Sequence, residues 1–323
     1  MQKLAKVLFL FLIVACGSDT GSKIISSSGV IDPNTGNGGN GGNGGDGSIP
    51  DLVVELISYY NDDTASFSTV FGNYTRSFIV HTPPNYDPNN GPIPLLFVLH
   101  GYTGQAPGIR NYSGFDSIAD EENFIVVYVQ GVADQITNNT GWNAGVGTFI
   151  NVDDVGLFSA LIKYFKGNYN IADDKIFSTG MSMGGFMSYR LACELEEINS
   201  IGSVTGSMAA YYNCVPPNQK SIIHFHGTAD TVVPYNGNSW SINVENVHSL
   251  WANHNECQNN SEVTIPDFNG DGVLSTQLTS YDCNGNREVI LYTMENEGHT
   301  WFKKEWGHDV DTSQLIWEFF KDK

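Results

Sequence analysis

The sequence predicts an α/β fold with a mostly parallel central sheet, and three observations lead to it. Two short runs at 95–99 and 124–129 are apolar throughout, which is typical of strands buried on both faces of a parallel sheet. Short apolar runs and amphipathic stretches with helical spacing then alternate along the chain. Neither an internal repeat nor a second break in composition follows residue 49. We therefore expect one domain at 49–323, with helices flanking the sheet.

The expected elements follow one another in a regular order. Residues 76–81 alternate and contain β-branched side chains, so they predict an edge strand ahead of the two buried ones. A helix at 153–164 carries its apolar side chains on one face, with Asp153 and Asp154 in its first turn, where carboxylates favour the helix dipole. There follow a strand at 175–179, a helix at 184–194, strands at 200–204, 221–226 and 288–294, and an amphipathic helix at 312–320.

Charge and composition narrow the possible classes of function. The 323 residues include 15 Lys+Arg and 35 Asp+Glu, a formal net charge of −20, and no basic cluster. Binding to nucleic acid requires Lys/Arg stripes against the phosphates, so we expect no nucleic-acid partner, nor adsorption to anionic lipid through charge. The 41% of apolar residues is enough for a globular core, and we expect the chain to act as a monomer.

The first residues predict an export signal. Lys3 and Lys6 precede an apolar run at 7–15 that is too short to span a bilayer. The run ends in IVAC (13–16) followed by Gly-Ser, which resembles a bacterial lipobox with cleavage before Cys16. We expect a signal peptide at 1–15, lipidation of Cys16 and a protein that touches the membrane only through this anchor, in the cell envelope (outer membrane or cell surface). An ordinary secretory signal, and hence a secreted protein, is the alternative.

Residues 16–48 predict a flexible tether between anchor and domain. The segment is rich in Gly, Asn and Ser and includes NTGNGGNGGNGGDG at 34–47. A phosphate-binding glycine loop is the alternative, but it would need a strand before it and a helix after it, and neither is predicted.

The candidate nucleophile is Ser182, in the sequence GMSMG at 180–184 between a predicted strand and a predicted helix. In a G-x-S-x-G turn the serine lies on a sharp strand-to-helix bend that exposes its Oγ, and glycines on either side allow close packing. The backbone N–H of Met183, at the start of the helix, can then stabilise an oxyanion. A structural serine in a glycine turn is the alternative.

The candidate acid and base follow in the order Ser, Asp, His, which is the order of α/β-hydrolases. Asp230 follows the apolar strand 221–226, and His299 follows the strand 288–294. Asp230 could instead cap a turn, and Asp153 and Asp154 are rival acids that fit the chain order less well. Of the other histidines, we expect His224 and His226 to be packed in the core.

A second oxyanion donor is expected in the loop after the first buried strand. Gly101 follows His100 and allows the backbone to turn, so that the N–H of Tyr102 or Thr103 can face the substrate. We expect His100 to hold this loop by hydrogen bonding rather than to transfer protons.

Taken together, these motifs resemble one family. The chain carries PLLFVLHGYTG (94–104), GWNAG (141–145), VDDVG (152–156), TGMSMGG (179–185), RLACE (190–194), HFHGTADTVVPY (224–235) and GHTW (298–301). They are similar to the secreted polyhydroxybutyrate depolymerase and feruloyl-esterase-like carbohydrate esterases, from about residue 76 to the end. The resemblance implies a Ser182–His299–Asp230 triad, hydrolysis of carboxylic esters without a cofactor, and substrate bound near Trp142 and Trp301.

The chain departs from this family pattern at three places. Tyr102 stands where many relatives have Cys, Met183 replaces Asn or Ala, and Phe302-Lys303 replaces Pro-Gly. These positions bear on the choice of substrate rather than on the type of reaction.

Four cysteines besides Cys16 suit an exported protein. Four allow three connectivities. The resemblance and the shortest loops suggest Cys193–Cys214 and Cys257–Cys283; buried free thiols are the alternative. No Cys/His spacing suggests zinc. Residues 267–272 (DFNGDG) resemble the start of a calcium loop, but position twelve is Leu278, so a hairpin turn beside the second disulfide is favoured.

The sequence thus predicts a serine carboxylic-ester hydrolase of the cell envelope, acting on an ester-bearing small molecule or polymer, with feruloyl or acetyl esters of polysaccharide fragments favoured. A short-chain polyhydroxyalkanoate depolymerase or general carboxylesterase is one alternative. A non-catalytic carbohydrate-binding surface lipoprotein is another.

Overall fold

A computed structural model describes residues 49–146 and 150–323. The chain divides into two units, Met1–Pro50 and Asp51–Lys323. The predicted signal peptide and the whole of the predicted tether, Cys16 included, lie outside the described residues. No helix within the described ranges is long and apolar enough to cross a membrane.

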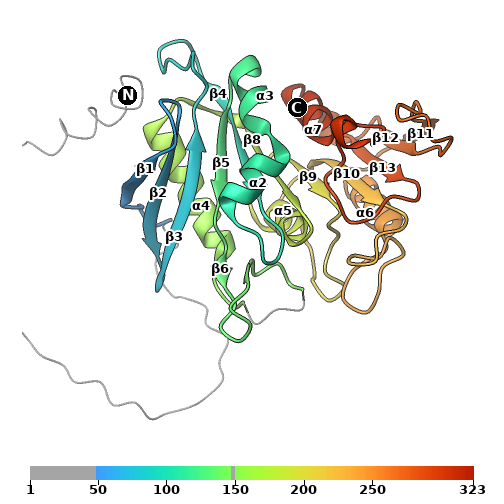
Figure 1. Cartoon of the computed structure of the whole chain (residues 1–323), viewed down its shortest axis with the longest axis horizontal. Coiled ribbons are helices and arrows are strands. Elements are labelled where there is room, and N and C mark those ends of the chain that lie inside the picture. Colours follow the sequence, from blue (N-terminus) through green and yellow to red (C-terminus); the bar gives the residue numbers. More distant parts are fainter. Residues whose placement is uncertain (1–48, 147–149) are drawn as a thin grey trace, which may run out of the picture. The chain divides into compact units, whose positions relative to one another are not determined.

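The second unit is built on one 11-stranded sheet (Figure 1). Six neighbouring strands in its middle run parallel, and antiparallel strands extend it on both sides. The spatial order is β1 (Val54–Tyr59), β2 (Thr64–Phe71), β3 (Tyr74–His81), β5 (Ile125–Val129), β4 (Ile93–Leu99), β8 (Ile171–Met181), β9 (Ser200–Val204), β10 (Ser221–Gly227), β13 (Val289–Met294), β12 (Thr276–Tyr281) and β11 (Asn259–Thr264). A separate pair joins β6 (Val132–Ala133) to β7 (Thr140–Gly141).

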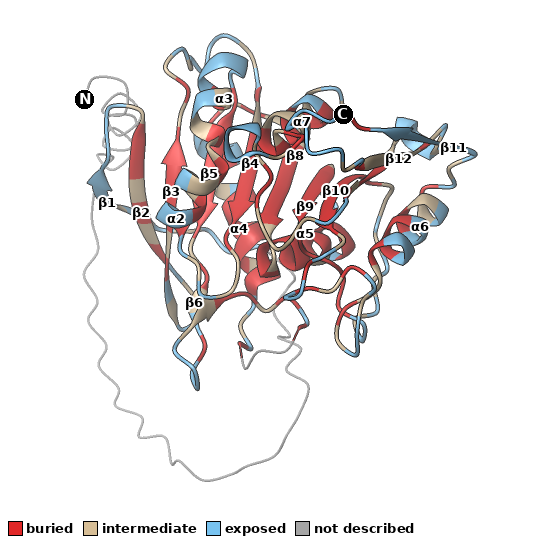
Figure 2. Cartoon of the chain, turned by 45° about the vertical axis from the view of Figure 1, so that its right-hand side comes forward, coloured by how far each residue is buried: buried red, intermediate tan, exposed pale blue. Residues whose placement is uncertain are grey.

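Helices cover both faces of the sheet, as the sequence predicts. On one face lie α2 (Ala106–Ser113), α3 (Phe115–Glu122) and α7 (Thr312–Lys321); on the other lie α4 (Asp154–Asn168), α5 (Met183–Glu194) and α6 (Val244–His254). Because both faces are covered, the central strands are buried along nearly their whole length (Figure 2). This explains why β4 and β5 are apolar throughout rather than alternating.

One strand prediction is wrong in its position. The strand predicted at 76–81 is β3, and it is not an edge strand, because it pairs with β2 on one side and β5 on the other. β1, β2 and the short helices α2 and α3 were not predicted from the sequence. β1 is mostly exposed and therefore lacks an apolar pattern, and α2 and α3 are only 8 residues long.

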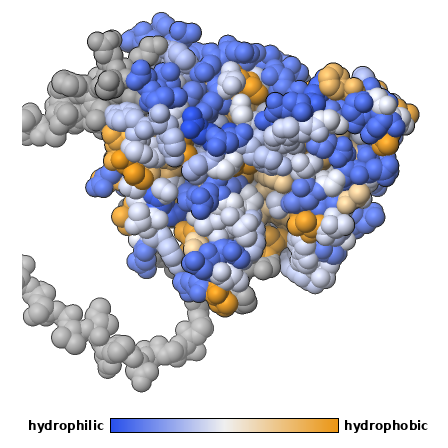
Figure 3. Space-filling model, viewed as in Figure 1, coloured by the Kyte–Doolittle hydropathy of each residue, from blue (hydrophilic) through white to orange (hydrophobic). Residues whose placement is uncertain are grey.

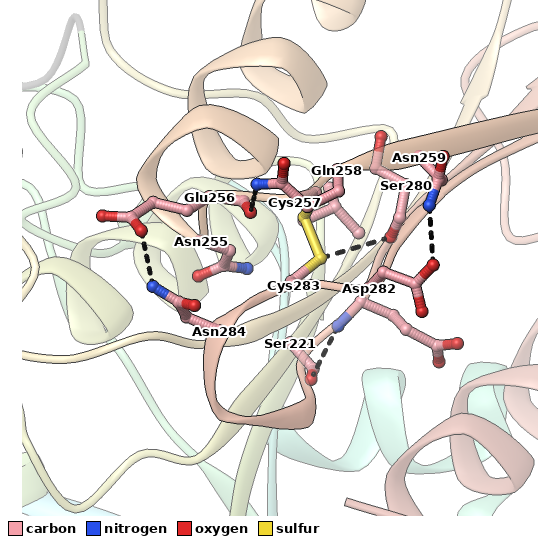
Figure 4. The surroundings of a disulfide bond; sticks show 12 residues. Ser221, Asn255, Glu256, Cys257, Gln258, Asn259, Ser280, Asp282, Cys283 and Asn284 are labelled. Carbon is pink, nitrogen blue, oxygen red and sulfur yellow. Dashed lines mark hydrogen bonds between the residues drawn. A yellow bond between two sulfur atoms is a disulfide. The ribbon is translucent and has the colours of Figure 1, made fainter.

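Both disulfides suggested by the sequence are present. Cys193–Cys214 ties the last turn of α5 to the segment after β9. Cys257–Cys283 closes the base of the β11–β12 hairpin, and hydrogen bonds from Asn284 to Glu256 and from Asn259 to Asp282 flank it (Figure 4). The bridge thus fastens an otherwise exposed hairpin at the end of the sheet.

The segment that resembles a calcium loop is the connection within this hairpin. The Asp267 carboxylate accepts the backbone N–H groups of Gly270, Asp271 and Gly272. A turn of this kind is what the sequence analysis favoured. Among the described residues, no group of three or more His, Cys, Asp or Glu is placed to hold a metal ion.

On the face of the second unit drawn in Figure 3, apolar side chains are scattered in small groups over a mostly hydrophilic surface. No single large apolar patch is visible on this face. Exposed large apolar side chains among the described residues include Val53, Val70 and Phe268.

Candidate active site

The parallel strands bring the predicted catalytic loops to one edge of the sheet. Leu99 at the end of β4 pairs with Gly180 of β8, and Gly227 at the end of β10 pairs with Met294 of β13. The loops that carry Gly101, Ser182, Asp230 and His299 all leave the sheet at this carboxyl edge. In open α/β sheets this is the edge where ligands bind.

Ser182 occupies a strained turn between β8 and α5. Its φ is 54° and its ψ is −120°, a conformation that residues with a side chain rarely adopt. A Cβ at Gly184 would collide with the carbonyl group of Leu99, and a Cβ at Gly180 would meet the backbone of Gly184. The two glycines therefore let the turn pack tightly, as the G-x-S-x-G motif requires.

The loop after β4 lies directly against Ser182. A Cβ at Gly101 would be 3.2 Å from Ser182 Cβ, so the Gly101 backbone closely approaches the serine. Of the two predicted oxyanion donors in this loop, the N–H of Thr103 donates to Thr140 O at 2.8 Å and is therefore engaged. Within the described residues, the Tyr102 N–H has no such acceptor. It joins the N–H of Met183, at the first position of α5, as the candidate donor pair.

Asp230 and His299 are in direct contact. His299 Nδ1 donates to Asp230 Oδ2 at 2.7 Å, and Asp230 Oδ1 accepts the N–H groups of Val232 and Val233 at 2.8 and 2.9 Å. Burial of Asp230 opposes ionisation, but the hydrogen bonds from His226, His299 and Val233 outweigh it and hold the pKa of Asp230 well below its ordinary value. With its proton on Nδ1, a neutral His299 has Nε2 free to accept a proton. This hydrogen bond fixes the orientation of the His299 ring relative to Asp230.

The structure contains no hydrogen bond between Ser182 Oγ and His299 among the described residues. Such bonds are often long in free enzymes and tighten in the substrate complex. Ser182 and His299 thus share the carboxyl edge of the sheet, while only the acid–base half of the predicted triad is joined by a hydrogen bond.

The rival acids have structural partners. Asp154 is fully buried and forms an ion pair with Arg76 at 2.7 Å, and its other oxygen accepts the N–H of Asn143 at 2.7 Å. Asp153 caps α4 through the N–H of Gly156. Both carboxylates are therefore occupied in holding α4 and the 141–145 segment, and neither contacts a histidine.

His100 holds two loops together, as expected. Its Nδ1 donates to Gly101 O at 2.8 Å and its Nε2 accepts the N–H of Gly131 at 2.9 Å. Burial lowers the pKa of His100 to about 4, so the side chain is neutral at pH 7.

The prediction that Trp142 and Trp301 bind substrate is not supported, because both side chains are completely buried. Trp142 Nε1 donates to His100 O at 2.8 Å, and its backbone N–H lies 3.3 Å from Met183 Sδ. Trp301 Nε1 donates to Ser313 Oγ at 2.9 Å. The two tryptophans support the loops of the site from below rather than forming its surface.

Sequence reasoning missed Tyr112 of α2, which supports the histidine loop. Its hydroxyl group lies 3.0 Å from Thr300 Oγ1 and accepts the N–H of Trp301 at 3.1 Å. The ring of Trp306, which is 44% exposed, stacks on Tyr112 at 5.1 Å. The sequence offered no signal for this contact, because α2 itself was not predicted.

Comparison with known proteins gives a consistent answer. The family model Esterase, described as "Putative esterase", matches residues 68–289. The "Probable feruloyl esterase C" of Aspergillus oryzae is 31% identical over 247 residues, covering 76% of this chain and 83% of that protein. "Feruloyl esterase D" of Neurospora crassa is 25% identical over 270 residues, covering 78% and 84%. The solved structure of an acetyl xylan esterase from Aspergillus awamori has a TM-score of 0.52 at 13% identity, covering 84% of this chain and all of that one. The last comparison shows a shared fold, the α/β-hydrolase fold that the sequence predicts.

Proposed function

We propose a residue-by-residue reaction for this chain from the premise that it belongs to the esterase family. The protein is a carboxylic ester hydrolase. His299 takes the proton of Ser182, whose Oγ attacks the ester carbonyl carbon. The N–H groups of Met183 and Tyr102 stabilise the oxyanion, and Asp230 holds His299 in the required tautomer. The alcohol then leaves with a proton from His299. Water, activated by His299, attacks the acyl group on Ser182, and the carboxylic acid is released as the serine regains its proton.

The contact between His299 Nδ1 and Asp230 Oδ2 carries this proposal. It joins two residues 69 positions apart, at the sheet edge where the strained Ser182 also lies. A carbohydrate-binding protein that merely kept the fold would need neither this contact nor a serine in an unfavourable backbone conformation.

For the substrate we propose feruloyl or acetyl esters of polysaccharide fragments. The similar proteins include feruloyl esterases, a bifunctional acetylxylan esterase/xylanase and an acetyl xylan esterase by name. For the location we propose the cell envelope, with Cys16 as lipid anchor, and we propose that the protein acts as a monomer. The motif at 13–18 supports the anchor.

One assay tests reaction and substrate together. Purified wild-type protein and the Ser182→Ala variant are compared on methyl ferulate, acetylated xylan, p-nitrophenyl acetate and a hydroxybutyrate oligomer. Loss of the nucleophile should lower kcat by about 10⁵–10⁶. Preference for the hydroxybutyrate oligomer would replace the polysaccharide-ester assignment, and equal activity of the two proteins would refute Ser182 as nucleophile. Replacement of Cys16 by Ser, followed by fractionation of cells, tests the anchor: the variant should leave the membrane fraction.

A further inference from the structure

Behind Asp230 the structure holds a row of buried polar side chains that the proposed reaction does not use. Tyr189 lies in α5, and His224 and His226 lie on one face of β10. All three are at most 2% exposed. Tyr189 Oη lies 2.9 Å from His224 Nδ1, and His224 Nε2 lies 3.1 Å from His226 Nδ1. We call these three residues the buried histidine row.

The row ends at the catalytic acid and its turn. His226 Nε2 lies 2.8 Å from Val233 O and 3.4 Å from Asp230 Oδ2. The first is a hydrogen bond, whereas the second is a longer polar contact. Val233 in turn donates its N–H to Asp230 Oδ1. His226 therefore contacts Asp230 Oδ2 directly. It also binds the carbonyl group of Val233, whose N–H donates to the other carboxylate oxygen, Oδ1.

The acceptors at this end fix the direction of every hydrogen bond in the row. A carbonyl group and a carboxylate can only accept, so His226 Nε2 must carry a proton. A neutral His226 then has an unprotonated Nδ1, which accepts from His224 Nε2–H. His224 Nδ1 accepts the hydroxyl proton of Tyr189 in the same way. In this arrangement each atom that faces another member of the row has a donor or an acceptor opposite it, and the backbone of Gly206 is a further partner of His224.

We propose that His226 is a positioning residue for ester hydrolysis, which fixes the Asp230 carboxylate and its turn so that Oδ2 faces His299. The role rests on the proposed Ser182–His299–Asp230 triad. His299 Nδ1 and His226 Nε2 approach the same oxygen, Oδ2, from different elements. His224 and Tyr189 set the tautomer of His226 and link the row to α5, the helix that begins beside the nucleophile.

Burial supports the neutral state of His224 and of Tyr189. Burial, and after it the neighbouring His226, lower the pKa of His224 well below its ordinary value. Burial also raises the pKa of Tyr189, so its hydroxyl group keeps its proton. The other titratable groups facing the row are Tyr235, whose ring is 6.0 Å from that of His226, and His248 of α6, on the side of His224.

Two variants of His226 separate its two ring nitrogens. The amide nitrogen of Gln can take the place of Nε2, and the amide oxygen of Asn can take the place of Nδ1. His226→Gln therefore keeps the donor toward Val233 and Asp230, whereas His226→Asn keeps only the acceptor for His224. We expect His226→Asn to lower kcat about tenfold with little change in KM, because the donor that holds Val233 O, and with it the turn around Asp230, is lost. His226→Gln should stay within about threefold of wild type.

The pH profile distinguishes positioning from mere stability. Without the His226 donor, Asp230 Oδ2 concentrates its charge on His299, so His299 becomes more basic. The acidic limb of kcat/KM should therefore move to higher pH in His226→Asn and stay in place in His226→Gln. Matched controls are His254→Asn and His254→Gln, because His254 also contacts a carbonyl group, Asn218 O at 3.2 Å, and is not one of the titratable groups that face the row. Both controls should leave kcat and the pH profile unchanged.

A measurement on the wild-type protein covers the case in which variants fail to fold. With ¹⁵N-labelled histidine, His224 and His226 should carry their proton on Nε2, whereas His100 and His299 should carry it on Nδ1. A His226 protonated on Nδ1 would overturn the proposal, as would equal kcat values and identical pH profiles for the two His226 variants. If wild type neither hydrolyses an ester nor reacts at Ser182 with an organophosphonate, the proposed function fails and the positioning role fails with it. If wild type hydrolyses an ester but His226→Asn and His226→Gln have the same kcat and the same pH profile, only the positioning role is refuted.

Discussion

The buried His100 should make the stability of the protein depend on pH. Its pKa falls from 6.5 to about 4 on folding, because burial penalises the charged ring. At pH values between about 4 and 6.5, His100 is protonated in the unfolded chain but neutral in the folded one. The free energy of unfolding therefore decreases as the pH falls through this range. The displacement corresponds to about 3 kcal/mol lost across this window. Above pH 7 the contribution is constant.

Urea unfolding at pH 7, 6, 5 and 4 tests this, with wild type beside His100→Gln. The glutamine side chain cannot be protonated, so the variant should begin less stable at pH 7 and lose about 3 kcal/mol less on acidification. His254→Gln is a matched control, because His254 is only partly buried and lies in α6, away from this loop. The other buried histidines contribute the same slope to both proteins and cancel in the comparison. If the free energy of unfolding depends on pH in the same way in wild type and in His100→Gln, burial of a neutral His100 does not cause the loss of stability in acid.

Three further predictions follow from particular contacts. Gly101→Ala places a methyl group 3.2 Å from Ser182 Cβ and should lower kcat/KM at least tenfold with a loss of less than about 1 kcal/mol in stability; a kcat/KM equal to wild type would contradict the close approach. Asp154→Ala leaves the Arg76 guanidinium buried without its partner and should lower the free energy of unfolding by about 3–5 kcal/mol in urea titrations, whereas an unchanged midpoint would show that the pair contributes nothing. Replacement of Cys257 and Cys283 together by Ala should cost about 3 kcal/mol because the bridge closes a separation of 26 residues, yet leave kcat on p-nitrophenyl acetate near wild type; a large loss of activity would mean that the hairpin reaches the site.

The sequence predicted the centre of the sheet well because full burial leaves a strong signal. The runs that became β4 and β5 are apolar and short, and few other structures suit such segments. The edges were harder to predict. β1 is mostly exposed, and the alternation along β2 is carried largely by Ser, Thr and Ala, so neither strand gives a strong apolar signal. The strand predicted at 76–81 was therefore assigned to an edge that β1 and β2 in fact cover.

The candidate site divides in the same way. Ser182, Asp230 and His299 could be predicted because their chemistry demands fixed turns at the ends of strands. The supporting contacts could not, since they join residues far apart in the chain: Tyr112 supports Trp301, and Arg76 holds Asp154. The family resemblance implied substrate near Trp142 and Trp301, and only the three-dimensional packing shows that both rings are buried.

The backbone of Ser182 has a consequence for attempts to make this protein more robust. A residue with φ of 54° and ψ of −120° stores on the order of 1–3 kcal/mol of strain that glycine would not feel. Ser182→Gly should therefore unfold at a higher temperature than wild type while losing the proposed nucleophile. On this proposal the protein gives up stability at the position of its reaction, so selection for thermal resistance alone would favour inactive variants. Screens for a more stable enzyme should measure turnover and unfolding together.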